Sequence, residues 1–127
     1  MEGWKWTSLP SMTGERDYHS CGRAGRFIVV VGGCCKAESK TTSEIFSLDS
    51  LTWTTGPGVP PIPDGKFYSS SVNQLEDTFY LLGGYGANTL VYEFDPEFFT
   101  WKLREERLET ARRSHALVSI PNKLLGA

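Results

Sequence analysis

Histidines and cysteines are the residues of this sequence best suited to metal binding or nucleophilic chemistry. His19 and His115 could act as metal ligands or general bases, and the adjacent Cys34 and Cys35 could form a redox pair or bind zinc. Two adjacent residues cannot comfortably ligate one ion, and no C-x-x-C pair or nearby histidine completes a site. The two histidines are 96 residues apart, twice a spacing that recurs along the chain. We therefore expect packing roles for the histidines, ordinary loop thiols for the cysteines, and no metal or cofactor.

Glycine pairs and a charged segment are the other candidates for chemistry. Residues 32–33 and 83–86 are glycine-rich, but neither segment is a G-x-G-x-x-G loop and no Gly-Lys-Ser/Thr follows, so nucleotide binding is not expected. Glutamates and arginines are mixed along residues 104–113, which indicates a solvated surface rather than a paired-acid catalytic site. The same segment lacks an apolar helical face, so we expect it to be an exposed loop.

Size and composition are those of one small domain. The 127 residues include 39% hydrophobic and 13% aromatic side chains, enough for a packed core, and the 13 glycines favour an all-β protein with many tight turns. The net charge of −2 does not favour binding to nucleic acid or an anionic membrane. No apolar run approaches the roughly 20 residues that span a bilayer, and the first ten residues lack the features of a signal peptide. Three cysteines, an odd number, suit a reducing compartment, so we expect a cytoplasmic or nuclear protein.

Three landmarks recur along the chain with a period of about 48 residues. Tryptophans at positions 6, 53 and 101 are separated by 47 and 48 residues. An apolar run followed by two glycines occurs at residues 27–33 and again at residues 79–84, with the glycine pairs 51 residues apart. A histidine or tyrosine follows each tryptophan, as His19, Tyr68 and His115. Independent markers that share one period indicate a chain of repeated structural units.

Each repeat is predicted to contain four short strands. The first lies at residues 19–21 and 68–72, and the second is the apolar run at residues 26–31 and 78–82. The third, at residues 44–48 and 90–94, ends in an aspartate that starts a turn, and the fourth carries the tryptophan. Four-stranded units with a period of about 40 to 50 residues are typical of β-propeller blades. In such blades we expect the glycine pairs to let inner strands approach and the tryptophans to fill the gap between blades.

The order of these landmarks resembles the Kelch repeat. The first unit contains the pattern in Trp6, Leu9, Met12, Arg16, His19, Gly32, Gly33, Phe46, Asp49 and Trp53. The second unit keeps Tyr68, Gly83, Gly84, Tyr92, Asp95 and Trp101, but it lacks the arginine and has a proline-rich linker. A third unit begins with Leu108, Arg112, Arg113 and His115. The resemblance spans essentially the whole chain.

The resemblance implies an all-β fold, namely an incomplete Kelch β-propeller with two full four-stranded antiparallel blades and partial flanking strands. We expect the outer strand of a preceding blade within residues 1–12, blade one at residues 13–56, blade two at residues 57–105 and the start of a third blade at residues 106–127. Kelch propellers close with about five to seven blades, so two blades alone would expose unpaired strands. We therefore expect the isolated chain to be marginally stable or to self-associate through its open blade edges.

Intracellular Kelch proteins recognise partner proteins on one face of the disc, so the resemblance implies a non-catalytic protein-interaction module. The corresponding loops are residues 34–43, 56–66, 85–89 and 102–113. Arginines in these loops could pair with an acidic peptide or substrate, while tyrosine and asparagine could add contact area. The candidate protein-binding residues are Arg16, Asp17, Lys66, Tyr85, Asn88, Arg112 and Arg113. No nucleic acid or membrane partner is expected.

Three functions are compatible with a Kelch-like chain. Many such propellers look like the substrate-recognition half of adaptors for cullin-based ubiquitin ligases, although no BTB or F-box segment is present in this sequence. Other Kelch proteins bind actin. Enzymes similar to galactose oxidase also use Kelch-type blades, but they need a copper site of tyrosines and histidines with a cross-linked cysteine. Two histidines at equivalent repeat positions do not supply that site, so we expect a protein that is not an enzyme.

Overall fold

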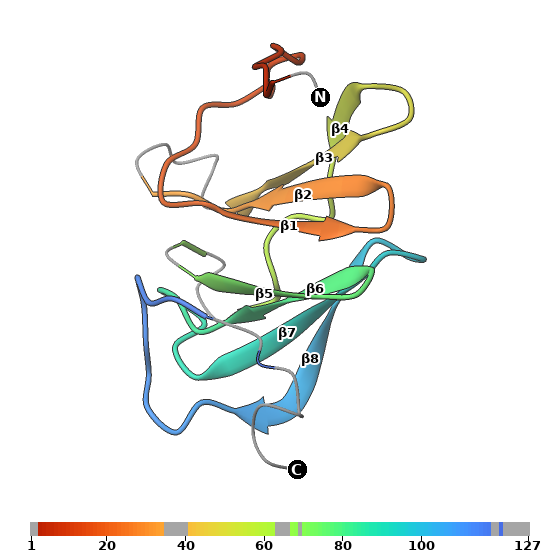
Figure 1. Cartoon of the computed structure of the whole chain (residues 1–127). Coiled ribbons are helices and arrows are strands. Elements are labelled where there is room, and N and C mark those ends of the chain that lie inside the picture. The colour runs from red at the N-terminus through yellow and green to blue at the C-terminus, as the bar shows by residue number, and fades with distance from the viewer. Residues whose placement is uncertain (1–2, 35–40, 63–66, 69, 118–119, 121–127) are drawn as a thin grey trace.

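The computed structural model of the chain describes residues 3–34, 41–62, 67–68, 70–117 and 120. These residues form two four-stranded antiparallel sheets, which Figure 1 shows one above the other. Sheet one consists of β1 (Ser20–Ala24), β2 (Phe27–Val31), β3 (Ser43–Ser47) and β4 (Thr52–Thr55), paired in that order. Sheet two consists of β5 (Ser71–Leu75), β6 (Thr78–Leu82), β7 (Leu90–Asp95) and β8 (Thr100–Arg107), also paired in order. The predicted all-β fold with two four-stranded antiparallel sheets is confirmed.

The turns within the two sheets follow the same backbone path. Between the first and second strands, Gly25 and Glu76 have φ angles of 57° and 51°. Between the third and fourth strands, Leu51 and Phe99 have φ angles of 56° and 52°. A left-handed residue at the same place in both sheets permits a tight reversal there. The sequence repeat is therefore also a repeat of backbone conformation.

The two sheets pack together through their inner strands, because β1 lies against β5 and β6. Alternate residues of β1 face sheet two, and Ser20, Gly22 and Ala24 are all buried. A Cβ atom at Gly22 would overlap the ring of Phe79, so a glycine is needed for this close approach. The hydrophobic core includes Ala24, Val29, Val31, Ile45, Ile62, Phe67, Phe79, Leu81, Tyr92 and Phe94.

The tryptophan of each outer strand is held in the same way. Trp53 pairs in register with Phe46, Trp101 pairs with Phe94, and the ring centroids lie 5.0 Å apart in both pairs. Each indole also donates a hydrogen bond to a carbonyl of the segment that leads into its sheet: Trp53 Nε1 to Pro10 O at 2.7 Å, and Trp101 Nε1 to Gly58 O at 3.2 Å. The aromatic partners of both tryptophans belong to their own sheet, and those of Trp101 include Phe79, whose ring abuts Gly22 of sheet one.

Hydrogen bonds after the glycine pairs define the equivalent residues of the two units. Cys34 N donates to Asp17 O, and Tyr85 N donates to Tyr68 O, both at 2.8 Å. Donor and acceptor are both shifted by 51 residues, so Tyr68 occupies the position of Asp17. The predicted equivalence of Tyr68 with His19 is therefore wrong by two residues. The cause is the longer proline-containing linker into sheet two, because the first two tryptophans are 47 residues apart and the glycine pairs 51.

Several predicted strand limits are wrong within the sheets; β1, for example, runs from residue 20 to 24 rather than from 19 to 21. β5 begins at Ser71 rather than at Tyr68, which forms only an isolated bridge with Tyr85. Residues 104–107, predicted to be part of an exposed loop, instead continue β8. Arg104 Nη1 lies 2.9 Å from Glu93 Oε2 on the neighbouring β7, and this cross-strand ion pair favours the extension of a charged segment as a strand.

The segments on either side of the two sheets contain no strand among their described residues. Residues 3–12 are irregular, and Trp4 and Trp6 are fully exposed, so the strand predicted there is not observed. An outer strand needs a third strand to pair with, and the described part of the chain has none beside this segment. Residues 108–117 are also irregular, while much of the predicted first strand of a third blade lies outside the described residues.

Candidate protein-binding face

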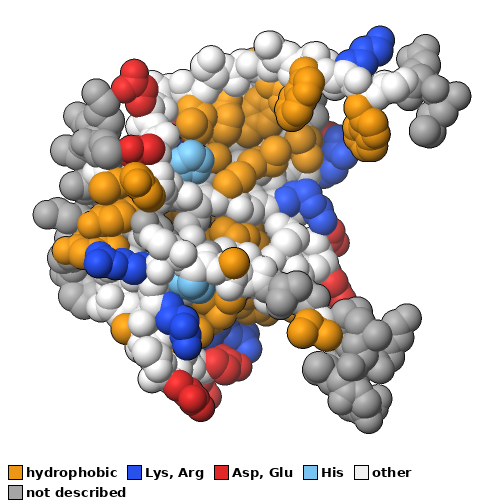
Figure 2. All heavy atoms as spheres, turned by 60° about the vertical axis from the view of Figure 1, so that its left-hand side comes forward, with side chains coloured by type: hydrophobic (Ala, Val, Ile, Leu, Met, Phe, Trp, Pro, Cys, Tyr) orange, Lys and Arg blue, Asp and Glu red, His pale blue; other side chains and the backbone are white. Residues whose placement is uncertain are grey.

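One face of the molecule collects both kinds of loop that the sequence singled out. In an antiparallel sheet with strands in sequence order, the loop from the second to the third strand and the segment leading into the next sheet emerge at the same end. These loops lie on the left of Figure 1, and Figure 2 brings that side forward. Lysine and arginine side chains lie there beside hydrophobic ones. We call this surface, which carries Asp17, Cys34, Tyr68, Tyr85, Asn88 and Arg113, the glycine-pair face.

Tyr85 is the centre of an aromatic and cationic cluster on the glycine-pair face. Its ring stacks on that of Tyr68, with centroids 4.5 Å apart and an interplanar angle of 17°. The guanidinium carbon of Arg113 lies 5.9 Å from the centroid of the Tyr85 ring, within the range of cation–π attraction. Tyr85 is 38% exposed and Arg113 is also exposed. The ring therefore holds a guanidinium at the surface, where a partner can reach it.

The second glycine pair fixes the backbone beneath this cluster. Gly84 N donates to Arg112 O at 2.7 Å, and Arg112 N donates to Asn88 O at 3.3 Å. A Cβ atom at Gly83 would lie 2.6 Å from Arg112 O, and the φ angle of Gly83 is 66°, which favours glycine. The pair thus lets the chain of residues 112–113 pass close to the loop after β6. Predicted residues Tyr85, Asn88, Arg112 and Arg113 come together in this way.

Tyr68 belongs to the cluster but is not among the predicted binding residues. Its pKa is raised above the ordinary value, first by partial burial and then by the neighbouring Tyr85 and Cys34. The hydroxyl is therefore protonated at neutral pH and can donate a hydrogen bond. Alignment of Tyr68 with His19 predicts a packing role for this residue instead. If the two repeats are aligned on their glycine pairs, which are 51 residues apart, Tyr68 corresponds to Asp17. This alignment places Tyr68 beside Tyr85, on the glycine-pair face.

Arg16 is a buried structural residue, which corrects the prediction that it binds a partner. Its side chain is 3% exposed, and its Nε lies 3.2 Å from Oε2 of Glu44, whose side chain is 6% exposed. Its Nη1 also donates to Gly32 O and Thr42 O, both at 3.0 Å. Thr13 completes the site by donating its N–H at 2.8 Å and its hydroxyl at 2.5 Å to Glu44 Oε1. The guanidinium is thus committed to the linker and sheet one.

Sheet two replaces this buried ion pair with aromatic side chains. Phe67 stands 51 residues after Arg16, the spacing of the glycine pairs. Tyr92 takes the place of Glu44, because each lies two residues before the phenylalanine that pairs with the outer tryptophan. Phe67 and Tyr92 are no more than 1% exposed, and the Tyr92 hydroxyl donates to Pro61 O at 2.9 Å. The arginine missing from the second repeat is therefore absent together with its carboxylate.

The remaining predicted binding residues do not join the cluster. Asp17 is half-buried at the start of sheet one, and its carbonyl accepts the hydrogen bond from Cys34. It holds in sheet one the position that Tyr68 holds in sheet two. Lys66 lies outside the described residues. The aromatic and cationic cluster around Tyr85 is therefore formed only by residues that lie beside the second glycine pair.

The histidines and cysteines are dispersed. His115 is half-buried and its Cε1 would lie 3.1 Å from a Cβ atom at Gly83, whereas His19 is exposed. The predicted packing role thus fits His115 and not His19. Cys34 is a free thiol, and Cys35 lies outside the described residues. Within the described ranges, no group of three or more His, Cys, Asp and Glu side chains is placed to hold a metal. None of the described residues forms a helix of the length and apolarity that crossing a membrane requires.

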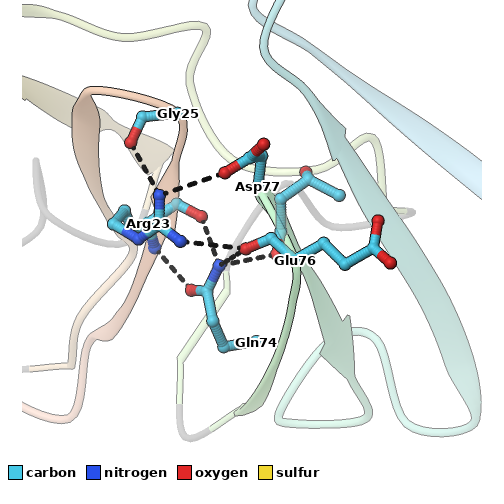
Figure 3. Close-up of polar contacts among 6 residues, drawn as sticks. Arg23, Gly25, Gln74, Glu76 and Asp77 are labelled. Carbon is cyan, nitrogen blue, oxygen red and sulfur yellow. Dashed lines mark hydrogen bonds and ion pairs between the residues drawn. The ribbon is translucent and has the colours of Figure 1, made fainter.

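A hydrogen-bond network at the opposite ends of the inner strands fixes the two sheets relative to each other (Figure 3). Gln74 Oε1 accepts from Arg23 N at 2.8 Å, and Gln74 Nε2 donates to Arg23 O at 2.7 Å. The Arg23 guanidinium in turn donates to Glu76 O at 2.9 Å and lies 3.5 Å from Asp77 Oδ1. The side-chain amide of Gln74 thus bonds both the backbone N–H and the backbone carbonyl of Arg23, as the backbone of a neighbouring strand would. The network therefore helps to set the position of sheet two and of its binding residues.

Similarity to known proteins is found in both sequence and structure. The chain is 29% identical over 113 residues to Kelch domain-containing protein 3 from Bos taurus, and the match covers 76% of this chain and 30% of that protein. The fold matches the structure of YjhT with a TM-score of 0.69 and 15% sequence identity, covering 87% of this chain and 34% of YjhT. The chain thus spans about one third of the length of each. No protein-family model matches the sequence.

Proposed function

We propose that this chain, a Kelch-repeat homologue whose two sheets match part of a Kelch propeller, is a non-catalytic module that binds another protein. The proposed contact surface is the part of the glycine-pair face around Tyr68, Tyr85, Asn88 and Arg113. The proposed ligand is an acidic segment of the partner. Arginine suits this ligand because its planar guanidinium can bind both oxygens of a carboxylate.

The position of Arg113 over Tyr85 is the observation that carries this proposal. An exposed arginine normally loses side-chain freedom when it binds a partner, and that loss weakens binding. Here the ring of Tyr85, itself stacked on Tyr68, already restrains the guanidinium 5.9 Å from its centroid. Tyrosine and arginine are also the residue types that most often dominate binding energy at interfaces. The side chain of Asn88 is exposed on the same face and can add a hydrogen bond.

An array of acidic peptides, each paired with a version in which Asp and Glu are replaced by Asn and Gln, tests the proposal directly. We expect the full chain to prefer acidic members. A hydrogen bond to a charged group is worth about 1.5–3 kcal/mol, so Arg113→Ala should weaken binding by roughly 10- to 150-fold. Arg113→Glu should abolish the preference for acidic peptides.

The matched control is Arg26→Glu. Arg26 is also a surface arginine, with a side chain 67% exposed, but it pairs with Asp49 at the opposite ends of the strands. This variant should retain acidic peptides as the unmodified chain does. Equal binding of acidic and amide peptides, or equal losses for the two glutamate variants, would refute the assignment of the glycine-pair face.

Within the Kelch class, we assign the partner as a substrate recognised for a cullin-based ubiquitin ligase, in the cytoplasm or nucleus. Support for this finer assignment comes from the family resemblance. The test is recovery of a cullin together with the full chain from cell extract, and stabilisation of the captured partner when the Arg113→Glu variant replaces the chain. Co-sedimentation with actin filaments in the absence of any cullin would count against it.

A further inference from the structure

Tyr85 is an exposed tyrosine in a loop of small side chains. It is 38% exposed, and its neighbours at 83–84 and 86–87 are three glycines and an alanine. Of the five tyrosines in the sequence only Tyr18 is more exposed, and Tyr92 is fully buried. Residues without bulky side chains let another molecule approach the main chain closely. An enzyme that modifies tyrosine hydroxyls can therefore reach Tyr85 with little obstruction.

Two arginines lie beside this tyrosine. The guanidinium carbon of Arg113 is 5.9 Å from the centroid of the Tyr85 ring, and the carbonyl of Arg112 accepts a hydrogen bond from Gly84 N at 2.7 Å. Both arginines are exposed, and neither forms an ion pair with another described residue. A phosphate placed next to arginines gains charge-assisted hydrogen bonds. A phosphate on Tyr85 would find positive charges already in place.

We propose that Tyr85 is a phosphorylation site, and that its phosphate pairs with Arg113 and so closes the glycine-pair face to acidic partners. This inference rests on the proposed function, because it names the regulation of the same surface. A tyrosine kinase would transfer the γ-phosphoryl group of ATP. The tyrosine oxygen forms the new O–P bond while the bond to the departing ADP oxygen breaks, and the hydroxyl proton is released. The product carries about −1.5 to −2 charges at neutral pH.

The side chains around the Tyr85 ring fit a phosphate at its hydroxyl end. Burial raises the pKa of Tyr68, whereas the charge of Arg113 acts on the same hydroxyl in the opposite direction. The guanidinium therefore lies close enough to influence the hydroxyl end of the stacked rings. A guanidinium that contacts the face of the Tyr85 ring has only to shift along the ring to reach the phosphate. The protonated hydroxyl of Tyr68 can donate a further hydrogen bond.

Phosphorylation should cancel the charge that an acidic partner meets. Arg112 and Arg113 contribute two positive charges, and the phosphate on Tyr85 offsets most or all of that charge. A bidentate pair between arginine and phosphate is also stronger than the cation–π contact that it replaces. A carboxylate of the partner would then compete with a phosphate held on the same chain. Binding of acidic peptides should therefore fall at least as far as it does in Arg113→Ala.

Access to Tyr85 is tested by treating the folded full chain with a tyrosine kinase of broad specificity and ATP. Mass spectrometry then locates the phosphate. Tyr18→Phe removes the most exposed competing tyrosine, and we expect phosphate at Tyr85 in this variant. Phosphate that appears at Tyr18 of the natural chain but never at Tyr85 would overturn the proposal. So would equal yields at Tyr85 and the buried Tyr92, because the modification would then report unfolding.

Phosphorus NMR of the phosphorylated chain tests the pairing with Arg113 without any partner. The half-titration pH of the phosphate should lie about one pH unit or more below that of a synthetic peptide of residues 81–89 phosphorylated at Tyr85. Arg113→Met should remove most of this difference, and the matched control Arg26→Met should retain it, because Arg26 pairs with Asp49 at the opposite ends of the strands. Equal half-titration values for the natural chain and Arg113→Met would overturn the proposal.

The array of acidic peptides then tests the regulation. Kinase treatment should weaken binding by about 10- to 150-fold, as Arg113→Ala does, and a phosphatase should restore it. In Tyr85→Phe, the binding measured before kinase treatment should be unchanged after it. Unchanged or tighter binding after phosphorylation at Tyr85 would overturn this inference and leave the proposed function in place. Absence of any preference for acidic peptides in the unmodified chain would instead refute the proposed function, and the phosphate titration would still decide the pairing with Arg113.

Discussion

The buried ion pair between Arg16 and Glu44 gives the most direct test of how the two sheets are stabilised. Arg16→Met removes the guanidinium but keeps an apolar side chain, and it leaves a carboxylate that is 6% exposed without its countercharge. Breaking a buried pair in this way costs about 3–5 kcal/mol of folding free energy. Hydrogen bonds from Thr13 remain, and the three bonds from Arg16 to Gly32 O, Thr42 O and Thr42 Oγ1 are lost.

Sheet two indicates which double substitution should restore stability. Phe67 and Tyr92 fill the corresponding space with at most 1% exposure. The double variant Arg16→Phe/Glu44→Tyr copies this arrangement, and the new hydroxyl can accept the hydrogen bond that Thr13 N donates. Replacing a whole buried ion pair by packed side chains is often neutral or stabilising. We expect the double variant to be more stable than either single variant and close to the natural chain.

Urea unfolding followed by tryptophan fluorescence provides the assay. With a slope of about 2 kcal/mol per molar urea, a loss of about 4 kcal/mol moves the midpoint by about 2 M. Arg26→Met is the control, because its ion pair with Asp49 has side chains that are 67% and 69% exposed and should contribute at most about 1 kcal/mol. Equal effects of the two arginine variants would refute the reasoning, as would a double variant whose loss equals the sum of the single losses.

Further predictions concern acid stability, sheet packing and association. Burial raises the pKa of Glu44, but hydrogen bonds from Thr13 and the charge of Arg16 outweigh burial and hold this pKa below the ordinary 4.5. The ionised carboxylate therefore stabilises the fold above that pH, and this stabilisation is lost as the pH falls further. In thermal unfolding between acid and neutral pH, the melting temperature of Glu44→Gln should fall less steeply toward acid pH than that of the natural chain. Gly22→Ala should cost about 1–3 kcal/mol by urea unfolding because of overlap with Phe79, whereas Gly3→Ala, which meets no atom within 4 Å, should cost nothing. Gln74→Ala should speed hydrogen exchange at Arg23 N, and an unchanged rate would show that the network in Figure 3 does not persist in solution. Light scattering should give an average mass that rises with concentration, since both ends of the two-sheet unit carry exposed apolar side chains; a constant monomer mass would contradict this.

Most of the strand pattern follows from local sequence signals. β6 and the start of β7 have the predicted limits, because a short apolar run between turn residues is a local feature. The same local signals fail at β8, because its charged residues 104–107 predict an exposed loop. The strand instead continues to Arg107, and Arg104 forms a cross-strand ion pair with Glu93. Residues 4–9 show the opposite error, since a strand-like sequence forms no strand without a partner strand beside it.

The candidate site also combines features that local sequence predicts with features that depend on tertiary contacts. The loop positions of Tyr85 and Asn88 were predictable because both follow a glycine pair, and that of Arg113 because it lies in the segment after the outer strand of sheet two. Tyr68 was missed because the linker before it is longer than the corresponding linker of sheet one, which displaced the alignment by two residues. Nothing local distinguishes Arg16 from Arg113, although the first is buried beside Glu44 and the second is exposed over Tyr85.

By itself, the sequence determined the period, the four strands of each unit and the all-β class, because these depend on apolar runs, turns and glycine pairs that neighbouring residues define. Only the tertiary structure decided which arginine is buried and which aromatic rings stack. Those outcomes depend on contacts between residues that are 17 to 31 positions apart, such as Tyr68 with Tyr85 and Thr13 with Glu44. A side chain's role in this protein is set by the sheet that the chain brings next to it.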